Sequence, residues 1–194
     1  WCVLQMELKV NRNLIFAEHQ QIETARLWLR PVSIMDAKDM FEYANDEETT
    51  RFVFVRHQTL EETRISIANY FMNEPLGKYA IEVKETGKMV GTIDLRIEDV
   101  AAVAELGYVL NKNYWGNGYI AEAAEALLDL GFTKLDLVRI FAYHDVENPN
   151  SGRVMEKLGM KQEGMIPDAR RWKEKVISVI LRGITKSEWA AAHQ

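Results

Sequence analysis

The sequence predicts a single domain of mixed α/β (α+β) class, and three observations support this. Strand-like and helix-like segments alternate along the chain, and no internal repeat or Pro/Ser-rich linker divides them. Three strand-like segments follow one another in the middle of the chain, and a turn at 84–88 joins the first two as a hairpin. The length of 194 residues suits one domain with a buried core.

The expected elements begin with a strand at 25–32, where leucines alternate with more polar residues. A helix follows to about residue 45, and Ser33 or Asp36 would cap it. A second helix begins near Thr59, has two glutamates in its first turn, and stops before a Pro-Leu-Gly sequence.

The rest of the chain predicts strands around one long amphipathic helix. Strands are expected at 79–83, 89–97, 103–110, 139–144, 161–165 and 176–183, and helices at 119–135, at 151–158 with Gly159 closing it, and at 186–192. We expect residues 1–21 to form a loosely attached N-terminal extension and residues 22–194 to form the domain.

Composition excludes several classes of function. The formal net charge of −5 disfavours a nucleic-acid partner, which requires a basic face. The apolar runs are too short and too often interrupted by charge to span a membrane, and no signal peptide is recognisable. Cys2 is the single cysteine, so an intrachain disulfide is excluded and a cytoplasmic location is expected. The four histidines lack the spacing of a metal site or a nucleophile triad, so no metal is expected.

The segment Gly116-Asn117-Gly118 carries the strongest functional signal. It lies between the strand at 103–110 and the long amphipathic helix. Glycine accepts a positive φ and lets backbone N–H groups approach a ligand closely. The unpaired N–H groups and the positive dipole at the helix start would form an anion site suited to a diphosphate. The alternative is a glycine-containing turn that binds nothing.

Two other phosphate-binding classes are weaker hypotheses. Residues 116–121 also fit the dinucleotide fingerprint G-x-G-x-x-A, which would indicate a hydride-transfer enzyme. That fingerprint belongs to a βαβ unit among parallel strands, whereas the strands here look antiparallel and no second βαβ unit follows. The loop G-x-x-x-x-G-K-[ST] of nucleoside triphosphatases is absent from the sequence.

A second motif follows the strand at 139–144 and identifies a family. It reads Glu-Asn-x-x-Ser-x-x-Val-Met-Glu-Lys-Leu-Gly-Met over residues 147–160. With Tyr-Trp-Gly-Asn-Gly-Tyr-Ile-Ala-Glu-Ala at 114–123 and Glu-Thr-Ala-Arg-Leu-x-Leu-Arg-Pro at 23–31, it closely resembles the GNAT family of acyl-CoA-dependent N-acyltransferases. The pairing looks like the RimJ/RimL-type branch, the ribosomal-protein N-terminal acetyltransferases. The resemblance spans residues 22–182, most of the chain.

The resemblance implies a fold, a cofactor and partners. The GNAT fold is a central mixed, mostly antiparallel twisted sheet of about seven strands with a V-shaped splay, flanked by about four helices. Acetyl-CoA is the implied cofactor and an amine the acceptor, with no nucleic acid or membrane partner, and the protein is expected as a monomer or homodimer. The implied coenzyme A contacts are Val109 and Leu110 along the pantetheine arm, Trp115, Gly116, Asn117, Gly118, Tyr119 and Ile120 at the diphosphate, and Asn148 and Ser151 beyond the splay.

The chain departs from the family pattern at two positions. The first motif usually begins with Arg or Gln, but Asn113 stands there, which leaves the diphosphate to backbone contacts. The tyrosine that many members use as general acid falls at Met155. Ser151 is the fallback acid, and Tyr108 or Tyr143 are further candidates. Apart from the resemblance, Ser151 also suits a helix cap and the Asn-Pro before it a turn.

The implied reaction is direct attack of an amine on the acetyl thioester, which needs a base and an oxyanion donor. An alkylammonium has a pKa of about 10 and is mostly protonated at neutral pH. Glu105, in the strand before the glycine segment, is the leading base by resemblance, and Asp94 is the alternative; each also suits an outward-facing strand position. The backbone N–H near Val109 or Leu110 is the implied oxyanion donor. His144 is the one histidine near this site.

The acceptor remains open between three hypotheses. A protein or peptide N-terminal α-amine comes first, a small amine such as a polyamine, amino acid or aminoglycoside second, and acyl-CoA binding without turnover third. Acidic residues at 46–48 and 61–62 could attract a cationic amine or be ordinary surface. The basic cluster at 170–173 is expected to be a solvated loop and not a nucleic-acid patch, and it could border the substrate entrance.

Overall fold

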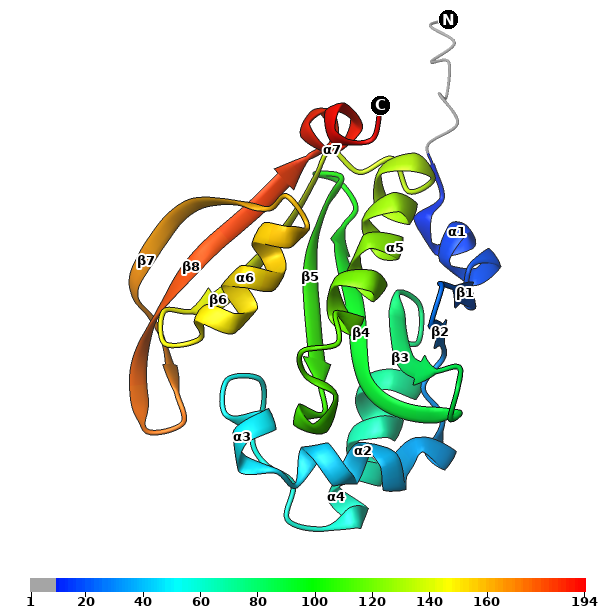
Figure 1. Cartoon of the computed structure of the whole chain (residues 1–194), viewed down its shortest axis with the longest axis vertical. Helices are drawn as coiled ribbons and strands as arrows, with labels where there is room; N and C mark the ends of the chain where they lie inside the picture. The colour runs from blue at the N-terminus through cyan, green and yellow to red at the C-terminus, as the bar shows by residue number, and fades with distance from the viewer. Residues whose placement is uncertain (1–9) are drawn as a thin grey trace, which may run out of the picture.

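The computed structural model describes residues 10–194, which form one eight-stranded sheet with helices packed against both faces (Figure 1). The strand order is β1-β2-β3-β4-β5-β6-β8-β7. Within residues 10–194, β5 and β6 form the one parallel pair, and the other neighbours are antiparallel. The strands are β1 (Ile22–Glu23), β2 (Leu27–Arg30), β3 (Lys78–Val83), β4 (Lys88–Glu98), β5 (Val103–Leu110), β6 (Arg139–Asp145), β7 (Lys161–Trp172) and β8 (Lys175–Thr185). The expected mixed, mostly antiparallel fold class is confirmed.

Each face of the sheet has its own hydrophobic core. The larger core holds Leu127 and Leu128 of α5, and the smaller one holds Met40 of α2 and Ile67. β5 serves both cores, because successive strand residues point to opposite faces. The helices are α1 (Arg12–Glu18), the 3-10 turn η1 (Ile34–Asp36), α2 (Ala37–Ala44), α3 (Glu47–Thr50), α4 (Leu60–Ser66), the π-helix η2 (Ile67–Met72), the 3-10 turn η3 (Lys112–Tyr114), α5 (Tyr119–Thr133), α6 (Pro149–Lys157) and α7 (Lys186–Ala192).

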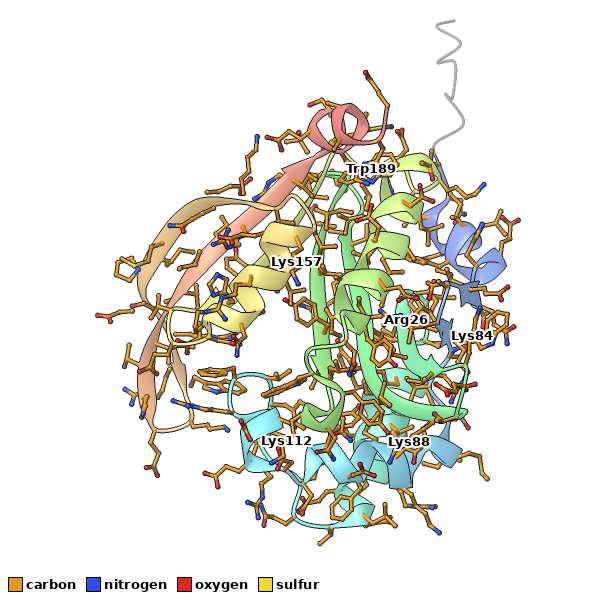
Figure 2. The ribbon with its side chains drawn as sticks, in the orientation of Figure 1. Arg26, Lys84, Lys88, Lys112, Lys157 and Trp189 are labelled. Carbon is orange, nitrogen blue, oxygen red and sulfur yellow. The ribbon has the colours of Figure 1, made fainter. Side chains whose placement is uncertain are left out.

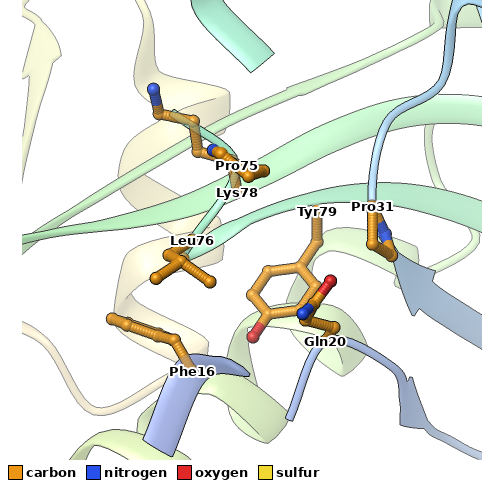
Figure 3. A pocket seen from close by; sticks show the side chains of 8 residues that line it. Phe16, Gln20, Pro31, Pro75, Leu76, Lys78 and Tyr79 are labelled. Carbon is orange, nitrogen blue, oxygen red and sulfur yellow. The ribbon is translucent and has the colours of Figure 1, made fainter. Parts of the chain in front are cut away.

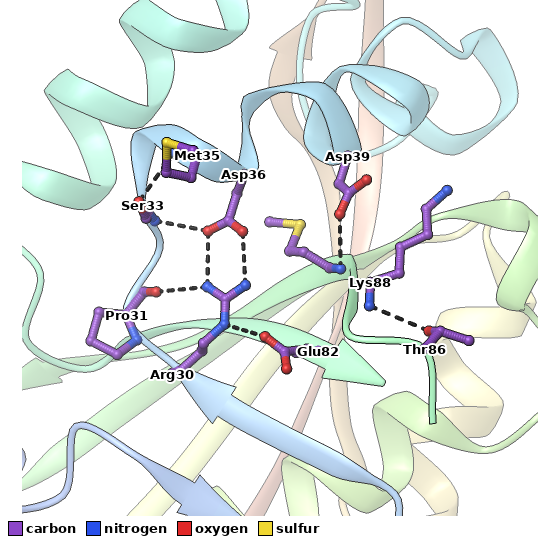
Figure 4. Close-up of polar contacts among 10 residues, drawn as sticks. Arg30, Pro31, Ser33, Met35, Asp36, Asp39, Glu82, Thr86 and Lys88 are labelled. Carbon is purple, nitrogen blue, oxygen red and sulfur yellow. Dashed lines mark hydrogen bonds and ion pairs between the residues drawn. The ribbon is translucent and has the colours of Figure 1, made fainter. Parts of the chain in front are cut away.

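Both residues proposed as the cap of the first long helix contribute to its start. Ser33 is the N-cap of η1, and its backbone N–H donates to Oδ2 of Asp36 at 2.8 Å. Arg30 of β2 then donates from Nη2 to Oδ1 of Asp36 at 2.8 Å and from Nε to Glu82 of β3 at 2.5 Å (Figure 4). The cap therefore also fixes α2 to the edge of the sheet. The second helix, α4, starts near Thr59 as expected, and Thr59 is its N-cap.

The helix α1 packs firmly on the domain, although it lies within the extension expected at 1–21. Phe16 is 4% exposed and belongs to the larger core, beside Leu76 and Tyr79 (Figure 3). Arg12 is 8% exposed and donates to the carbonyl of Leu135 at 2.8 Å. Residues from 12 onward are thus attached to the core, while the domain boundary itself stays a prediction. Cys2 lies outside the described residues.

The parallel pair β5 and β6 separates soon after it forms. The register pairs Val103 with Arg139 and Glu105 with Phe141, and no pairing of these two strands continues past that point. β5 runs on to Leu110 with β4 alone as its neighbour. Figure 1 shows the two strands meeting near α7 and diverging toward α3. This is the expected V-shaped splay.

The C-terminal hairpin differs from the expectation. β7 was expected to end at residue 165, with a solvated loop at 170–173. The structure instead pairs Arg170 with Ile177 and Trp172 with Lys175, so β7 continues to Trp172 after a register shift. A bulge interrupts the alternation of a strand without ending it, which is why the sequence pattern stops early. The short α3 and the π-helical end of the second helix were also not predicted.

Candidate functional site

The glycine segment has the backbone that the sequence predicted. Gly116 has φ of 82° and Gly118 has φ of 76°, both in the left-handed region that favours glycine. Gly118 is the N-cap of α5, and no side chain caps this helix start. A Cβ added at Gly116 would meet no atom within 4 Å. The start of α5 thus has no side-chain cap, and the space at Gly116 beside it is open, as an anion site requires.

The other residues of this segment support the loop. The Asn117 side chain donates to the carbonyl of Tyr114 at 3.0 Å, and Ile120 is buried in the larger core. The Tyr119 ring packs beneath the guanidinium of Arg26. Of these three residues, we therefore expect the backbone and not the side chain to meet a ligand.

The far end of β5 presents backbone groups to the splay. The N–H of Asn111 donates to the carbonyl of Val90 at 2.8 Å, so this residue faces β4. Alternate residues of an antiparallel ladder face the same neighbour. Val109 therefore also faces β4, whereas Tyr108 and Leu110 direct their backbone groups toward the side of β6.

These backbone groups have no strand partner, because β6 pairs with β5 only as far as Glu105. The carbonyl of Leu110 accepts a hydrogen bond from Nε1 of Trp115 at 2.8 Å. The N–H of Leu110 and the backbone of Tyr108 then face the splay, where they can pair with an extended ligand as a strand would. Of the two residues expected along the pantetheine arm, we expect Leu110 to supply the oxyanion donor.

The start of α6 lies across the splay from β5. Asn148 is the N-cap of α6, and its side chain accepts from the N–H of Ser151 at 3.4 Å, so the cap is Asn148 and not Ser151. The hydroxyls of Ser151 and Tyr108 are 2.7 Å apart, which links α6 to β5. Burial raises the pKa of Tyr108 to about 12. Tyr108 is therefore a neutral hydrogen-bond donor at physiological pH.

The two candidate bases share one guanidinium. Arg96 donates from Nη1 to Asp94 at 2.9 Å, and its Nη2 is 2.8 Å from Oε1 of Glu105. Asp94 also accepts from the hydroxyl of Tyr70 at 2.8 Å. Burial raises the pKa of Asp94, while Arg96 and Tyr70 act against this shift. Glu105 is more exposed than Asp94 and stands at the last paired position before the splay, and it stays the leading candidate of the two. Sequence reasoning did not find Arg96.

Two residues considered at the sequence level belong to the packing of the fold. His144 is buried, and its Nε2 accepts from Nε of Arg182 at 3.3 Å. A Cβ at Gly152 would lie 2.9 Å from that ring, so α6 packs directly on it. Met155, at the place of the family tyrosine, is 2% exposed in the larger core.

The acceptor side is bounded by α3 and by the tip of the β7–β8 hairpin. Nε1 of Trp172 donates to the carbonyl of Arg51, just after α3, at 3.1 Å. Arg170 and Lys173 lie over the Trp172 ring, so this contact carries positive charge. Lys112 pairs with Asp46 at 2.7 Å and holds α3 beside the end of β5. The expected entrance cluster is therefore a strand end that touches α3.

Comparison with known proteins decides the family. A family model of the acetyltransferase (GNAT) domain matches residues 26–161. The chain belongs to the GNAT acetyltransferase family. This GNAT enzyme is 33% identical over 176 residues to the "Uncharacterized N-acetyltransferase p20" of Bacillus licheniformis, which covers 88% of this chain and 99% of the relative. The GNAT-family acetyltransferase of Bacillus anthracis superposes with a TM-score of 0.78 at 29% identity, covering 87% of this chain and 99% of that one.

A more distant relative has a named substrate. The spermidine N(1)-acetyltransferase of Escherichia coli (strain K12) is 25% identical over 138 residues, which cover 70% of this chain and 73% of the relative. Family membership makes this protein an N-acetyltransferase and sets aside the hydride-transfer hypothesis. Within residues 10–194, no helix is long and apolar enough to cross a membrane, and no group of three or more His, Cys, Asp or Glu side chains could hold a metal ion.

Enzymes of this family use acetyl-CoA as the acetyl donor, and the site fits such a molecule. The uncapped start of α5 suits the diphosphate, and the space above Gly116 leaves room for it. The splayed end of β5 suits the amides of the pantetheine arm. Bound there, acetyl-CoA would supply an activated thioester.

Proposed function

We propose that this GNAT enzyme acetylates the N-terminal α-amine of a protein or peptide, as in the RimJ/RimL-type branch that its motifs resemble. The charge of the acceptor side carries this proposal. Lys112 pairs with Asp46 and Glu48, and Arg64 pairs with Glu61, so most acidic residues there are already engaged. The hairpin tip opposite them is basic. A polycation would thus meet few free carboxylates, whereas a peptide with one terminal charge meets no such conflict.

The basicity of the acceptor supports the same choice. An α-amino group has a pKa near 8, so roughly a tenth of it is unprotonated at neutral pH, whereas an alkylamine with a pKa near 10.4 is almost fully protonated. Glu105 is engaged by Arg96 and is not a free carboxylate. An amine that loses its proton readily suits this arrangement.

The reaction can then be assigned to the chain's own residues. Glu105, directly or through water, accepts the proton of the amine, and the nitrogen lone pair forms the new N–C bond. The N–H of Leu110 donates to the oxygen that becomes negative. The C–S bond breaks as the carbonyl reforms, the electron pair leaves on sulfur, and a second proton leaves the nitrogen for the thiolate or for water, which gives the neutral amide and the thiol. The cytoplasmic location and the oligomeric state stay predictions.

Release of coenzyme A thiol from acetyl-CoA, with product masses, tests the acceptor. The panel holds peptides with a free N-terminus, the same peptides blocked at the N-terminus but carrying an internal lysine, and spermidine. We expect turnover of the free peptides alone. Preferred turnover of spermidine would assign the enzyme to small amines instead. If none of the amines in the panel stimulates thiol release, the peptide proposal is refuted.

Charge reversal at the hairpin tip tests the stated cause. Arg170→Glu should increase spermidine turnover relative to peptide turnover, because it removes a repulsive charge beside the acceptor entrance. Lys134→Glu, at the far end of α5, is the matched control and should leave the ratio unchanged. Equal ratios in both variants would contradict the electrostatic argument.

A further inference from the structure

Arg26, which lies far from the glycine segment in sequence, is held against the first turn of α5. Its Nε donates to Oε2 of Glu122 at 2.7 Å, and its backbone N–H donates to Oε1 at 2.7 Å. Thr24 also donates to Oε1 of Glu122, at 2.8 Å. The guanidinium lies over the Tyr119 ring, 4.6 Å from its centroid. Several contacts from two directions therefore fix where this cation stands.

That position is beside the anion site. A Cβ added at Gly118 would lie 3.7 Å from Nη2 of Arg26, and this is the one atom found within 4 Å of it. The Arg26 side chain is 48% exposed, and its terminal nitrogens have no hydrogen-bond partner among residues 10–194. Figure 2 shows Arg26 beside the N-terminal half of α5. The guanidinium thus has donors available next to the helix-start amides.

The charge balance at the start of α5 requires a cation. Glu122 places a carboxylate in the first turn, close to where a diphosphate would bind. Burial acts to raise the pKa of Glu122, but hydrogen bonds from Arg26 and Thr24 outweigh it and lower the pKa, so the residue is ionised at neutral pH. Without Arg26, its charge would repel a phosphate. Arg26 offsets the carboxylate through Nε and still presents its outer nitrogens.

Two other basic residues of this part of the molecule are engaged elsewhere. Lys88 pairs with Glu42 and Lys112 pairs with Asp46. Asn113, at the position where the family usually has Arg or Gln, carries no charge, and its backbone N–H donates to Oδ1 of Asn111 at 3.0 Å. A side chain from another part of the chain would therefore have to supply the missing positive charge.

We propose that Arg26 binds the diphosphate of coenzyme A together with the amides at the start of α5. A planar guanidinium can donate to Glu122 on one edge and to phosphate oxygens on the other. The inference rests on the proposed function in that acetyl-CoA occupies the splay. Arg26 would supply the side-chain contact to the diphosphate that Asn113 does not provide.

Calorimetric titration with coenzyme A tests this without relying on turnover. Arg26→Gln should raise the Kd about tenfold, since a charge-assisted contact to phosphate is lost. The increase should be the same with dephospho-coenzyme A, which keeps the diphosphate but lacks the 3′-phosphate. An increase seen only with intact coenzyme A would overturn the assignment to the diphosphate.

Glu122→Gln separates ligand binding from a purely structural role. If Arg26 only anchored α5, breaking its bond to Glu122 from either side would weaken binding equally. Our proposal predicts the opposite sign: Glu122→Gln removes a negative charge beside the diphosphate, so the Kd should stay the same or fall. A matching tenfold increase in both variants would refute the proposal. Lys84→Gln, a paired cation on the same sheet edge, is the control and should leave the Kd unchanged.

The design keeps the two proposals distinguishable. If wild-type protein takes up no coenzyme A, the proposed function fails; if wild type binds and Arg26→Gln binds equally well, only the role of Arg26 fails. Thermal melting checks that each variant is folded at the titration temperature. Should Arg26→Gln be unfolded there, Arg26→Lys decides, because it keeps the charge but loses the planar donor pair. We expect about a threefold rise in Kd for it, and an unchanged Kd would overturn the proposal.

Discussion

Gly118→Trp is the substitution that most directly tests the anion site. The change places an indole at the N-cap of α5, over the amides that we assign to the diphosphate. The proposal predicts that coenzyme A binding is lost while the fold survives. The second half of this prediction is as important as the first, because an unfolded variant would also fail to bind.

The structure sets the size of both effects. Gly118 has φ of 76°, and a side chain in the left-handed region costs about 1–2 kcal/mol. For a chain of this size, that cost lowers the melting temperature by roughly 2–8 °C. No atom lies closer than 3.7 Å to the added Cβ, so the Cβ itself adds no clash. Losing two charge-assisted hydrogen bonds costs about 3–6 kcal/mol of binding, which is at least about a hundredfold in Kd.

Gly87→Trp is the matched control. Gly87 lies in the β3–β4 turn, has φ of 69°, and a Cβ there would meet no atom within 4 Å. It should therefore lose similar stability without any change in coenzyme A affinity. Calorimetric titration and thermal melting of both variants give the comparison. Near-normal affinity in Gly118→Trp, or an equal loss of affinity in Gly87→Trp, would refute the reasoning.

Three other substitutions test separate features. Glu105→Gln should lower kcat about a hundredfold while the Kd for coenzyme A stays constant, because a base acts on the amine and not on the cofactor; a pH–rate profile identical to wild type would remove Glu105 from this role. Tyr108→Phe should keep the alkaline limb of that profile up to about pH 10, because the phenol, with a pKa of about 12, remains protonated throughout; a limb that disappears in this variant would contradict us. Phe16→Ala should lower the free energy of unfolding by about 3 kcal/mol in urea titrations, and a loss below 1 kcal/mol would mean that α1 contributes little to the core.

Much of the fold could be predicted because its elements have regular periodicity and marked ends. The strand expected at 103–110 is β5 with the same bounds, and the helix expected to begin near Thr59 is α4. The predictions of secondary structure fail where contacts between distant parts of the chain, and not the local sequence pattern, decide the structure. β7 continues through a bulge that its sequence does not mark, and α1 gains its order from Phe16 and Arg12, whose partners lie far along the chain.

The candidate site divides in the same way. The glycines were predictable, because a positive φ at 116 and 118 is a backbone requirement that the sequence records. Arg96 was not, since its importance comes from two carboxylates on neighbouring strands that only the register brings together. Neither was Arg26, whose role depends on a helix that begins more than ninety residues later. Side chains whose partners lie on other strands or helices produce no characteristic spacing in the sequence, so their roles could not be predicted from it.

The absent family tyrosine has a physical consequence for the reaction. Met155 is buried in the core, and two of the other candidate acids, Tyr108 and Ser151, have their hydroxyls hydrogen-bonded to each other at 2.7 Å. A phenol with a pKa of about 12 cannot readily protonate the thiolate of a thiol with a pKa near 8.5, because the transfer is uphill by about 5 kcal/mol. It can donate a hydrogen bond to that sulfur without giving up its proton. The thiolate is already a good leaving group, so the demanding steps are removal of the amine proton and stabilisation of the oxyanion, and these depend on Glu105 and the end of β5.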